Sequence, residues 1–369
     1  MTEHGHARKP KGELRRGWTT GTCAAAAAAA AFRALLTGAP QQTVTVRLPK
    51  GEAPTFDLSR CEKTDEGWRA SVIKDAGDDP DVTHGAEVIS SVRKLATGEG
   101  IRFRAGDGVG TVTLPGLPVP VGEPAINPSP RAIIGDALAA VADELDASCD
   151  VEVTVSIPGG DKIAEKTMNP RLGIKGGLSI LGTTGVVIPF SCASWINSIH
   201  RGIDVARLQG IEHLIAATGS TSEAAAMREH PDLPEQAFID MGDFAGGLLK
   251  YLRRHPAPRL TIVGGVAKLT KLAQGHLDLH SKRSAVDLGK LADAARKHGA
   301  SDDLAAAIRG ANTAMQAFEH SRQAGVPLAD IIARQARETA MASLAGETDV
   351  GIIVYDRAGN RVGTSHHDG

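Results

Sequence analysis

Two patterns of apolar and polar residues follow one another along the chain. In the first part, short alternating segments predict β-strands at 43–48, 55–58, 67–73, 100–104, 109–117 and 151–157. Helical spacing predicts helices at 83–95 and 129–147. An alanine-rich stretch predicts a further helix, capped by Thr20 or Thr22 and stopped at Thr37 and Gly38. Together these elements indicate an α+β domain over residues 14–190.

The second part of the chain has a different order of predicted elements. Apolar strands predicted at 211–217, 237–241 and 260–263 are each followed by a glycine-bearing turn and a helix. This order is typical of a parallel sheet. Alanine-rich helices follow from about 286 to 345, then an apolar strand at 349–355 and a frayed tail at 364–369. We therefore predict a mixed α/β protein, with a C-terminal Rossmann-like parallel-sheet domain over residues 205–369.

The amino-acid composition disfavours several classes of function. The 369 residues are 42% hydrophobic and 23% charged, with a net charge of −2, which gives no overall attraction to nucleic acid or to an anionic membrane. Aromatic residues make up only 3%, which disfavours a base-stacking surface. The four cysteines (Cys23, Cys61, Cys149 and Cys192) match no zinc spacing and suit a reducing compartment.

The N-terminal region contains an octet of alanines that resembles a membrane or signal segment. Arginines flank the octet, Arg33 interrupts the apolar run, and residues 17–22 are polar where an apolar core would begin. We therefore expect no membrane span, no signal peptide and a cytoplasmic protein. The first dozen residues have the composition of a mobile basic tail.

A glycine-rich, basic stretch runs from Pro158 to Pro189. Its cations include Arg171 and Lys175, and it contains the turn Gly182–Thr183–Thr184–Gly185. Cationic side chains beside exposed backbone N–H groups favour carboxylates or phosphates. The alternative is a set of ordinary loops with solvated lysines, but the density of such residues favours a functional surface.

The start of the alanine-rich helix is a second candidate anion site. Thr20 and Thr22 lie where free N–H groups and the helix dipole attract negative charge. A simply well-capped helix explains the same residues equally well. Cys23 is better interpreted as a small buried residue than as a nucleophile, because no base lies near it in the sequence.

An acidic loop occupies residues 74–85. Its Asp75, Asp78, Asp79 and Asp81 lack the glycine and the glutamate that a calcium-binding EF-hand loop requires. Asp-rich turns usually cap helices or face solvent, whereas Asp75, Asp78 or His84 are also candidates for a general base. Both interpretations stay open.

The parallel-sheet part predicts a nucleoside site. Ligands of such sheets bind beyond the carboxyl ends of the strands, which places the segments 219–223, 240–243 and 264–268 along one rim. Asp240 follows the first turn by about twenty residues, as ribose-binding acids do. The full GxGxxG fingerprint is absent, so ordinary turns of an α/β domain remain the alternative.

Residues 268–284 form a second basic cluster. Lys268 and Lys271 fit one face of a helix, and His276 and His280 have the spacing of a helical metal site. Gly275, and Asp278 between the two histidines, argue against a regular helix there. Contact with acidic groups is the favoured interpretation.

Six segments carry a resemblance to a known family. In order, they are LRRGWTTGTCAAAA, KDAGDDPDVTHGAE, NPRLGIKGGLSILGTTGVVIPFS, ATGSTSE, MGDF and KLTKLAQGHLDLHS. Together they resemble the CbiD family, over nearly the full chain. The resemblance implies C1 methylation of cobalt-precorrin-5B to cobalt-precorrin-6A in cobalamin biosynthesis, with S-adenosylmethionine as the methyl donor. Cobalt would arrive inside the corrinoid substrate, so no protein metal site is implied.

The resemblance gives the candidate residues their expected roles. Those expected to bind the methyl donor are Gly219, Ser220, Thr221, Asp240, Gly242, Asp243 and Gly264. Those expected to bind the corrinoid are Thr20, Thr22, Arg171, Lys175, Thr183, Thr184, Lys268, Lys271, His276 and His280. Asp75, Asp78 and His84 are the candidate bases. A homo-oligomer and handover of substrate between neighbouring pathway enzymes are both compatible with this interpretation.

Two other functions share some of these features. A nicotinamide-dependent reductase of a corrinoid precursor would use the same rim of turns. A non-catalytic tetrapyrrole carrier would use the same cationic surface without binding a donor. Nicotinamide binding distinguishes the first, and the clustered glycine turns disfavour the second.

Overall fold

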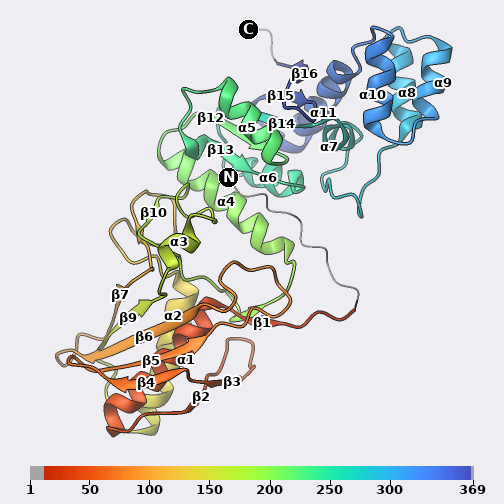
Figure 1. Cartoon of the computed structure of the whole chain (residues 1–369). Coiled ribbons are helices and arrows are strands. Elements are labelled where there is room, and N and C mark those ends of the chain that lie inside the picture. The colour runs from red at the N-terminus through yellow and green to blue at the C-terminus, as the bar shows by residue number, and fades with distance from the viewer. Residues whose placement is uncertain (1–11, 367–369) are drawn as a thin grey trace. The chain divides into compact units, whose positions relative to one another are not determined.

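The computed structural model describes residues 12–366 (Figure 1). The chain divides after Cys192 into two compact units, which we call unit 1 and unit 2. Each unit is described by itself below. The predicted N-terminal tail lies outside the described residues, except for Gly12.

Unit 1 is built around a five-stranded sheet with the order β4-β5-β6-β9-β7. Neighbouring strands are antiparallel except β7 and β9, which are parallel. Two long helices, α1 and α2, pack on each other, and α1 also packs on β5 and β6. The elements are β1 (Gly17–Trp18), α1 (Thr20–Thr37), β2 (Thr43–Thr45), β3 (Thr55–Asp57), β4 (Arg60–Lys63), β5 (Trp68–Ile73), β6 (Glu87–Lys94), β7 (Ile101–Ala105), β8 (Thr111–Val112), α2 (Pro128–Glu144), β9 (Val151–Ser156), α3 (Gly160–Ala164), β10 (Ile174–Lys175) and β11 (Val186–Val187).

The alanine octet is the centre of unit 1. Ala24 to Ala31 are each at most 2% exposed, because side chains this small let α1 approach both the sheet and α2 closely. Thr19, one residue before the predicted caps, caps the helix, and Gly38 ends it in the left-handed conformation at φ 72°. The helix is long and apolar enough to span a membrane, but 78% of it is buried inside the protein. Its composition is therefore that of a core helix.

Residues 83–95 were predicted as a helix, and this prediction was wrong. They contain β6, whose Val88, Ser90 and Val92 alternate into the core while the residues between them face outward. Ser90 donates its hydroxyl proton to the carbonyl of Ala24, 2.8 Å away. This face of β6, with its β-branched Val88 and Val92, packs on α1. That packing prevails over the helical spacing of the apolar residues. The predicted strand 109–117 is also shorter than expected, since only Thr111 and Val112 are in β8.

Unit 2 has the predicted Rossmann-like core (Figure 1). Its sheet has the order β13-β12-β14-β15-β16, in which the first four strands are parallel and β16 is antiparallel. The elements are α4 (Cys192–Leu208), β12 (His213–Ala217), α5 (Ser220–Glu229), the 3-10 helix η1 (Glu235–Ala237), β13 (Phe238–Asp240), α6 (Ala245–Leu252), β14 (Arg259–Gly265), α7 (Val266–Ala273), α8 (Leu288–Lys297), α9 (Asp302–Arg309), α10 (Ala314–Gln323), α11 (Leu328–Leu344), β15 (Asp349–Tyr355) and β16 (Arg361–Ser365).

The end of the chain differs from the sequence prediction. Thr364 and Ser365 belong to β16, which pairs with β15, so the predicted frayed tail at 364–369 was wrong for these residues. The ring of His366 lies so close to Gly351 that a Cβ there would be 2.8 Å from its Nδ1. Pairing with a buried strand therefore holds this polar segment in place, although it has no apolar pattern of its own.

We predict that unit 2 loses stability as the pH falls from about 6.5 towards 4. Burial, with His230 and Arg259 nearby, lowers the pKa of His213 to about 4. A histidine whose pKa is lower in the folded than in the unfolded state stabilises the fold above its unfolded pKa, and that contribution disappears on acidification. The melting temperature measured by calorimetry should fall in this window. His213→Gln, which keeps a group for the bond to Thr261 Oγ1, should flatten the fall; an unchanged pH profile would contradict the assignment.

Candidate functional site

Three segments far apart in the sequence meet in unit 1: residues 15–22, 74–85 and 181–190. We call this place the unit 1 junction. β1 lies between the other two segments, because Trp18 N donates to Asp75 O at 2.8 Å while β1 pairs with β11. Gly17 has no room for a side chain, since a Cβ there would be 2.1 Å from the carbonyl carbon of Ala76. The glycine therefore permits the contact between β1 and the acidic loop.

The start of α1 is covered by the third segment of this junction. Thr22 is fully buried and donates its hydroxyl proton to Gly185 O at 2.7 Å. The amide of Gly21 donates to Leu181 O at 3.0 Å, and the amide of Thr22 donates to the cap Thr19. Protein groups thus satisfy the amides that the sequence offered to an anion. Thr20 is buried as well, which favours the interpretation as a well-capped helix.

The acidic loop is held by a buried ion pair. The Lys74 side chain is only 1% exposed, and its Nζ lies 2.5 Å from Asp81 Oδ2. The other oxygen of Asp81 accepts hydrogen bonds from the amide of Thr83 at 2.8 Å and from its hydroxyl at 2.6 Å. Lys74 and Asp81 therefore fix the shape of the loop from within.

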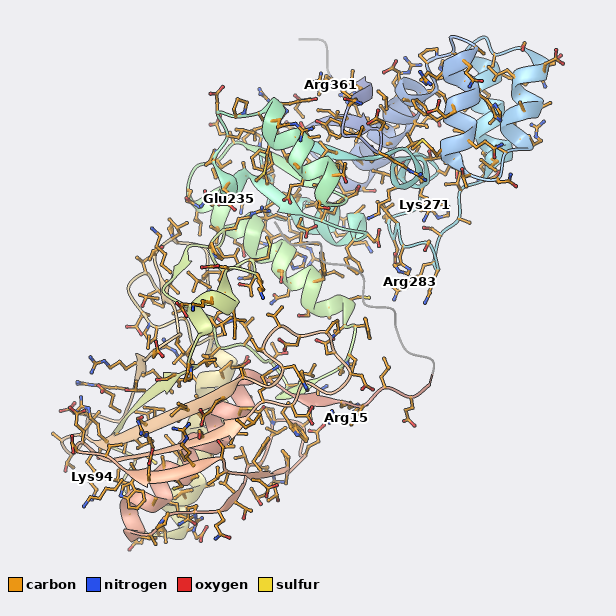
Figure 2. All side chains as sticks on the ribbon, viewed as in Figure 1. Arg15, Lys94, Glu235, Lys271, Arg283 and Arg361 are labelled. Carbon is orange, nitrogen blue, oxygen red and sulfur yellow. The ribbon has the colours of Figure 1, made fainter. Side chains whose placement is uncertain are left out.

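The candidate bases of this loop differ in their surroundings. The guanidinium of Arg15 pairs with Asp75 and lowers the pKa of that carboxyl to about 2, which makes Asp75 a weak base (Figure 2 labels Arg15). Asp78 Oδ2 accepts from the amide of Arg15 at 2.7 Å. His84 Nδ1 accepts from the amide of Ala76 at 3.1 Å, so its proton is on Nε2, and the ring offers a donor rather than a basic lone pair.

Asp79 differs from its neighbours in the loop. Its Oδ1 accepts a hydrogen bond from the amide of Phe190 at 2.8 Å and so joins the acidic loop to the segment 181–190. Burial raises the pKa of the Asp79 carboxyl. Phe190 has a φ of 58°, which is rare for a bulky residue. Asp79 belongs to the acidic run of this loop but was not among the candidate bases, because the acidic spacing alone gives no signal of this contact.

The glycines of the glycine-rich stretch mainly allow backbone segments to pack closely. A Cβ on Gly160 or on Gly177 would lie 2.3 or 2.2 Å from Gly108 O, so three backbone segments converge at Gly108. The predicted cation Lys175 is exposed on β10, Arg171 is half-buried and makes contacts of its own, and Thr183 is exposed beside the half-buried Thr184. Lys175 and Thr183 are therefore free to meet a ligand from solvent.

The second candidate place is the rim of the parallel sheet in unit 2. β12 lies between β13 and β14, so the connections from β12 and β14 leave the sheet in opposite directions, and this switch point is where such folds bind ligands. Gly219 and Gly265 precede α5 and α7, and no side chain caps either helix. A Cβ on Gly264 would be 2.5 Å from Thr218 Oγ1. Glycines therefore let the turns at this rim pack closely against each other.

Lys268 connects two turns of this rim. Its ammonium group donates to Thr218 O and lies 3.0 Å from Asp243 Oδ1. Asp243 is only 8% exposed, and although this ion pair is close, its angles leave Oδ1 without a hydrogen-bond partner. Next to Asp243, Gly242 takes a φ of 56° against the ring of Trp195. The rim thus holds a buried acceptor oxygen beside glycine-bearing turns.

The basic cluster begins in α7, which carries Lys268 and Lys271, and continues as a loop after Ala273, as Gly275 suggested. Lys271 is buried and donates to Leu279 O at 2.8 Å, so its charge anchors the loop (Figure 2 labels Lys271). His280 Nδ1 accepts from the amide of Lys282 at 3.2 Å, and His276 lies half-buried in the same loop. Within residues 12–366, no cluster of His, Cys, Asp or Glu has a metal-binding arrangement.

Two surface hollows lie away from both places. One, of about 360 Å³, is lined by residues such as Leu35 and Lys63, and the other, of about 480 Å³, by residues such as His213 and Asp349. The second is at the amino ends of the parallel strands, opposite to the rim. Neither contains a residue of the predicted site.

Known proteins match the chain at both ends and over most of its length. A family model described as CbiD matches residues 7–189, and one described as the CbiD C-terminal domain matches residues 278–366. A relative from Brucella suis biovar 1 is 57% identical over 352 residues, which are 95% of each chain. The chain belongs to the CbiD family. This membership confirms the resemblance drawn from the six sequence segments.

One further relative and one solved structure are also similar to the chain. A relative from Halorhodospira halophila is 54% identical over 95% of this chain and 94% of its own. Both relatives carry the name cobalt-precorrin-5B C(1)-methyltransferase. The 1.9 Å crystal structure of a cobalamin biosynthesis protein (cbiD) from Archaeoglobus fulgidus is 28% identical, with 86% of each chain covered and a TM-score of 0.40.

Proposed function

We propose that this CbiD family member is a C-methyltransferase that uses S-adenosylmethionine to methylate C1 of cobalt-precorrin-5B, giving cobalt-precorrin-6A. The observation that carries the proposal is the likeness to relatives of that name, at 54–57% identity over about 95% of the chain. An identity this high over both units makes a different reaction class, such as the nicotinamide-dependent reductase, the weaker candidate.

We assign the methyl donor to the rim of unit 2, and the chemistry of the rim fits it. Gly219 leaves backbone open to a nucleoside, Gly242 and Gly264 let the neighbouring turns pack closely beside it, and Ser220 and Thr221 are exposed at the start of α5. The buried Oδ1 of Asp243 lacks the hydrogen-bond donor that a ribose hydroxyl would supply. Asp240, at the end of β13, is the second acid within this rim.

The corrinoid substrate carries carboxylate side chains around a flat apolar ring, so a suitable surface needs cations, backbone donors and apolar groups. The unit 1 junction offers the exposed Thr183 and an apolar margin, and Lys175 is exposed elsewhere in unit 1. The large apolar side chains exposed on or beside the junction are Ile73, Val82, Leu181 and Ile188, at 43–53%. We assign the substrate to this surface, with His84 Nε2–H as a donor to it.

The chain's own contribution to the reaction is position and exclusion of water. A bound sulfonium donor supplies a methyl group that is already electrophilic, so the protein has little covalent chemistry to perform. The protein must hold the acceptor carbon in line with the carbon–sulfur bond, which alone accounts for several kcal/mol of barrier lowering, about 7–11 in favourable cases. Rigid turns at both places, fixed by Lys268 and by Lys74, suit this task.

Calorimetric titration of the purified protein with S-adenosylhomocysteine, and with NADPH in parallel, tests the donor. We expect saturable binding of S-adenosylhomocysteine alone, weakened at least about tenfold in Asp240→Ala, because one charge-assisted hydrogen bond contributes about 1.5–3 kcal/mol. Glu235→Ala, an acid of η1 outside the rim, is the matched control. Binding of NADPH alone would move the chain to the reductase class, and cobalt-precorrin binding without either nucleotide would move it to the carrier class.

A further inference from the structure

Asp79 holds a strained backbone in place. Phe190 follows Pro189 and has a φ of 58°, a conformation that is strained for a bulky residue. The amide of Phe190 donates to Asp79 Oδ1 at 2.8 Å, across 111 positions of sequence. Strain of this kind persists only where the surroundings fix it, and it collects at functional sites. Asp79 itself precedes Pro80, which restricts its own backbone to extended conformations.

The second oxygen of Asp79 has no such contact. Within residues 12–366, no hydrogen bond or ion pair reaches Asp79 Oδ2, whereas Asp75 pairs with Arg15 and Asp81 pairs with Lys74. The charged groups that act on Asp79 are Asp81 and Lys74 of its own loop, and the segment 181–190 contains no titratable side chain. Asp79 is thus the half-buried carboxylate of the loop without a cation of its own.

Exposed apolar side chains lie near Asp79 and near its partner Phe190 along the chain. Val82 is exposed three residues after it, and Ile188 is exposed two residues before its partner Phe190. A flat apolar ring laid on these side chains would exclude water from the carboxylate and strengthen its interaction with a proton on that ring. An acid half-buried in such surroundings keeps a proton at a higher pH than an exposed aspartate does.

We propose that Asp79, rather than Asp75, Asp78 or His84, accepts the proton that the corrinoid gives up when it is methylated. The inference rests on the proposed function and adds to it the identity of the proton acceptor. Asp79 Oδ1 remains bonded to the amide of Phe190, and Oδ2 takes the proton.

The atoms and electrons of the step balance within the two substrates and Asp79. The carbon–sulfur bond of the donor breaks with its electron pair on sulfur, and a π electron pair of the ring forms the new carbon–carbon bond to the methyl group. The ring then holds one positive charge, which it loses when a C–H proton adjacent to the conjugated system moves to Asp79 Oδ2. The products are a thioether, a methylated ring and a neutral carboxylic acid, which returns its proton to water.

Asp79→Asn is the decisive variant. Its amide oxygen still accepts from Phe190 while the side chain cannot take a proton. We expect an unchanged melting temperature, unchanged S-adenosylhomocysteine affinity, unchanged substrate affinity followed by the corrinoid absorption, and a single-turnover methylation rate lowered about 10²–10⁴-fold. Asp150→Asn, on a carboxylate of unit 1 outside the junction that also accepts backbone N–H groups, is the matched control and should stay within a few-fold of wild type.

Two further measurements distinguish a failure of this proposal from a folding defect and from a failure of the proposed function. Carboxyl ¹³C resonances of the wild-type protein, assigned by comparison with Asp79→Asn, should show Asp79 titrating above the range of an exposed aspartate. Asp79→Glu should recover part of the rate. A carboxyl that titrates in the ordinary range, or an Asp79→Asn rate within a few-fold of wild type, overturns the proposal. A wild-type protein that neither binds S-adenosylhomocysteine nor methylates the corrinoid overturns the proposed function instead.

Discussion

Asp81→Asn is expected to lower the free energy of unfolding of unit 1 by about 3 kcal/mol, which a denaturant titration of the full chain would measure. The reason is the ammonium group of Lys74, which is 1% exposed and loses its counter-ion in this variant. Removing one partner of a buried pair costs more than the pair itself contributes, because the remaining charge stays desolvated. The bonds from Asp81 to Thr83 weaken at the same time, so the acidic loop should also become easier to cleave by proteases.

Two further variants separate the buried charge from other effects. Asp78→Asn changes an exposed neighbour whose oxygen accepts a backbone N–H, and it should alter the stability by less than about 0.5 kcal/mol. Lys74→Met combined with Asp81→Asn removes the unpaired charge and should recover much of the loss. Equal stability of Asp81→Asn and Asp78→Asn would mean that water reaches Lys74 and that the ion pair contributes little.

The sequence predicted the elements of unit 2 better than those of unit 1, for a physical reason. A strand buried on both faces of a parallel sheet is a continuous apolar run, and each run here is closed by a glycine turn. In unit 1 the two-residue strands β1, β8, β10 and β11 hold few side chains, so their pairing depends on segments far away. The strands β4 and β16 were also missed, and so was the helix α4, although Ile199, Ile203 and Ala206 have helical spacing on its buried side.

The candidate site could be predicted as a list of segments but not as contacts. The segments around Thr22, Asp75 and Gly185 were all singled out, yet only the fold shows that they form one junction. Conversely, the sequence offered the amides before Cys23 to an anion, whereas Leu181 O accepts from the amide of Gly21 and the Thr19 hydroxyl accepts from that of Thr22. Glycine signals a close approach of backbone without saying to what, and in unit 1 the approach is largely to protein.

Lys268→Met is expected to weaken S-adenosylhomocysteine binding about 30-fold, which corresponds to about 2 kcal/mol. Lys268 joins the turn after β12, through Thr218 O, to the turn after β13, through Asp243. Without the ammonium group, Asp243 is a buried carboxylate with no partner, and it would take up a proton or turn towards water. Either response disturbs the acceptor that we assign to the donor ribose, and calorimetry would measure the loss.

The outcome distinguishes a site effect from a general loss of stability. Lys250→Met removes an exposed lysine of α6 and should leave both affinity and melting temperature unchanged. Lys268→Met combined with Asp243→Asn should restore the melting temperature, because no buried charge remains, while the affinity stays low, because the charged acceptor is lost. If Lys268→Met lowers the melting temperature but binds S-adenosylhomocysteine as wild type does, the contacts of Lys268 stabilise unit 2 without belonging to the donor site. The donor would then have to be sought away from the switch point of the sheet.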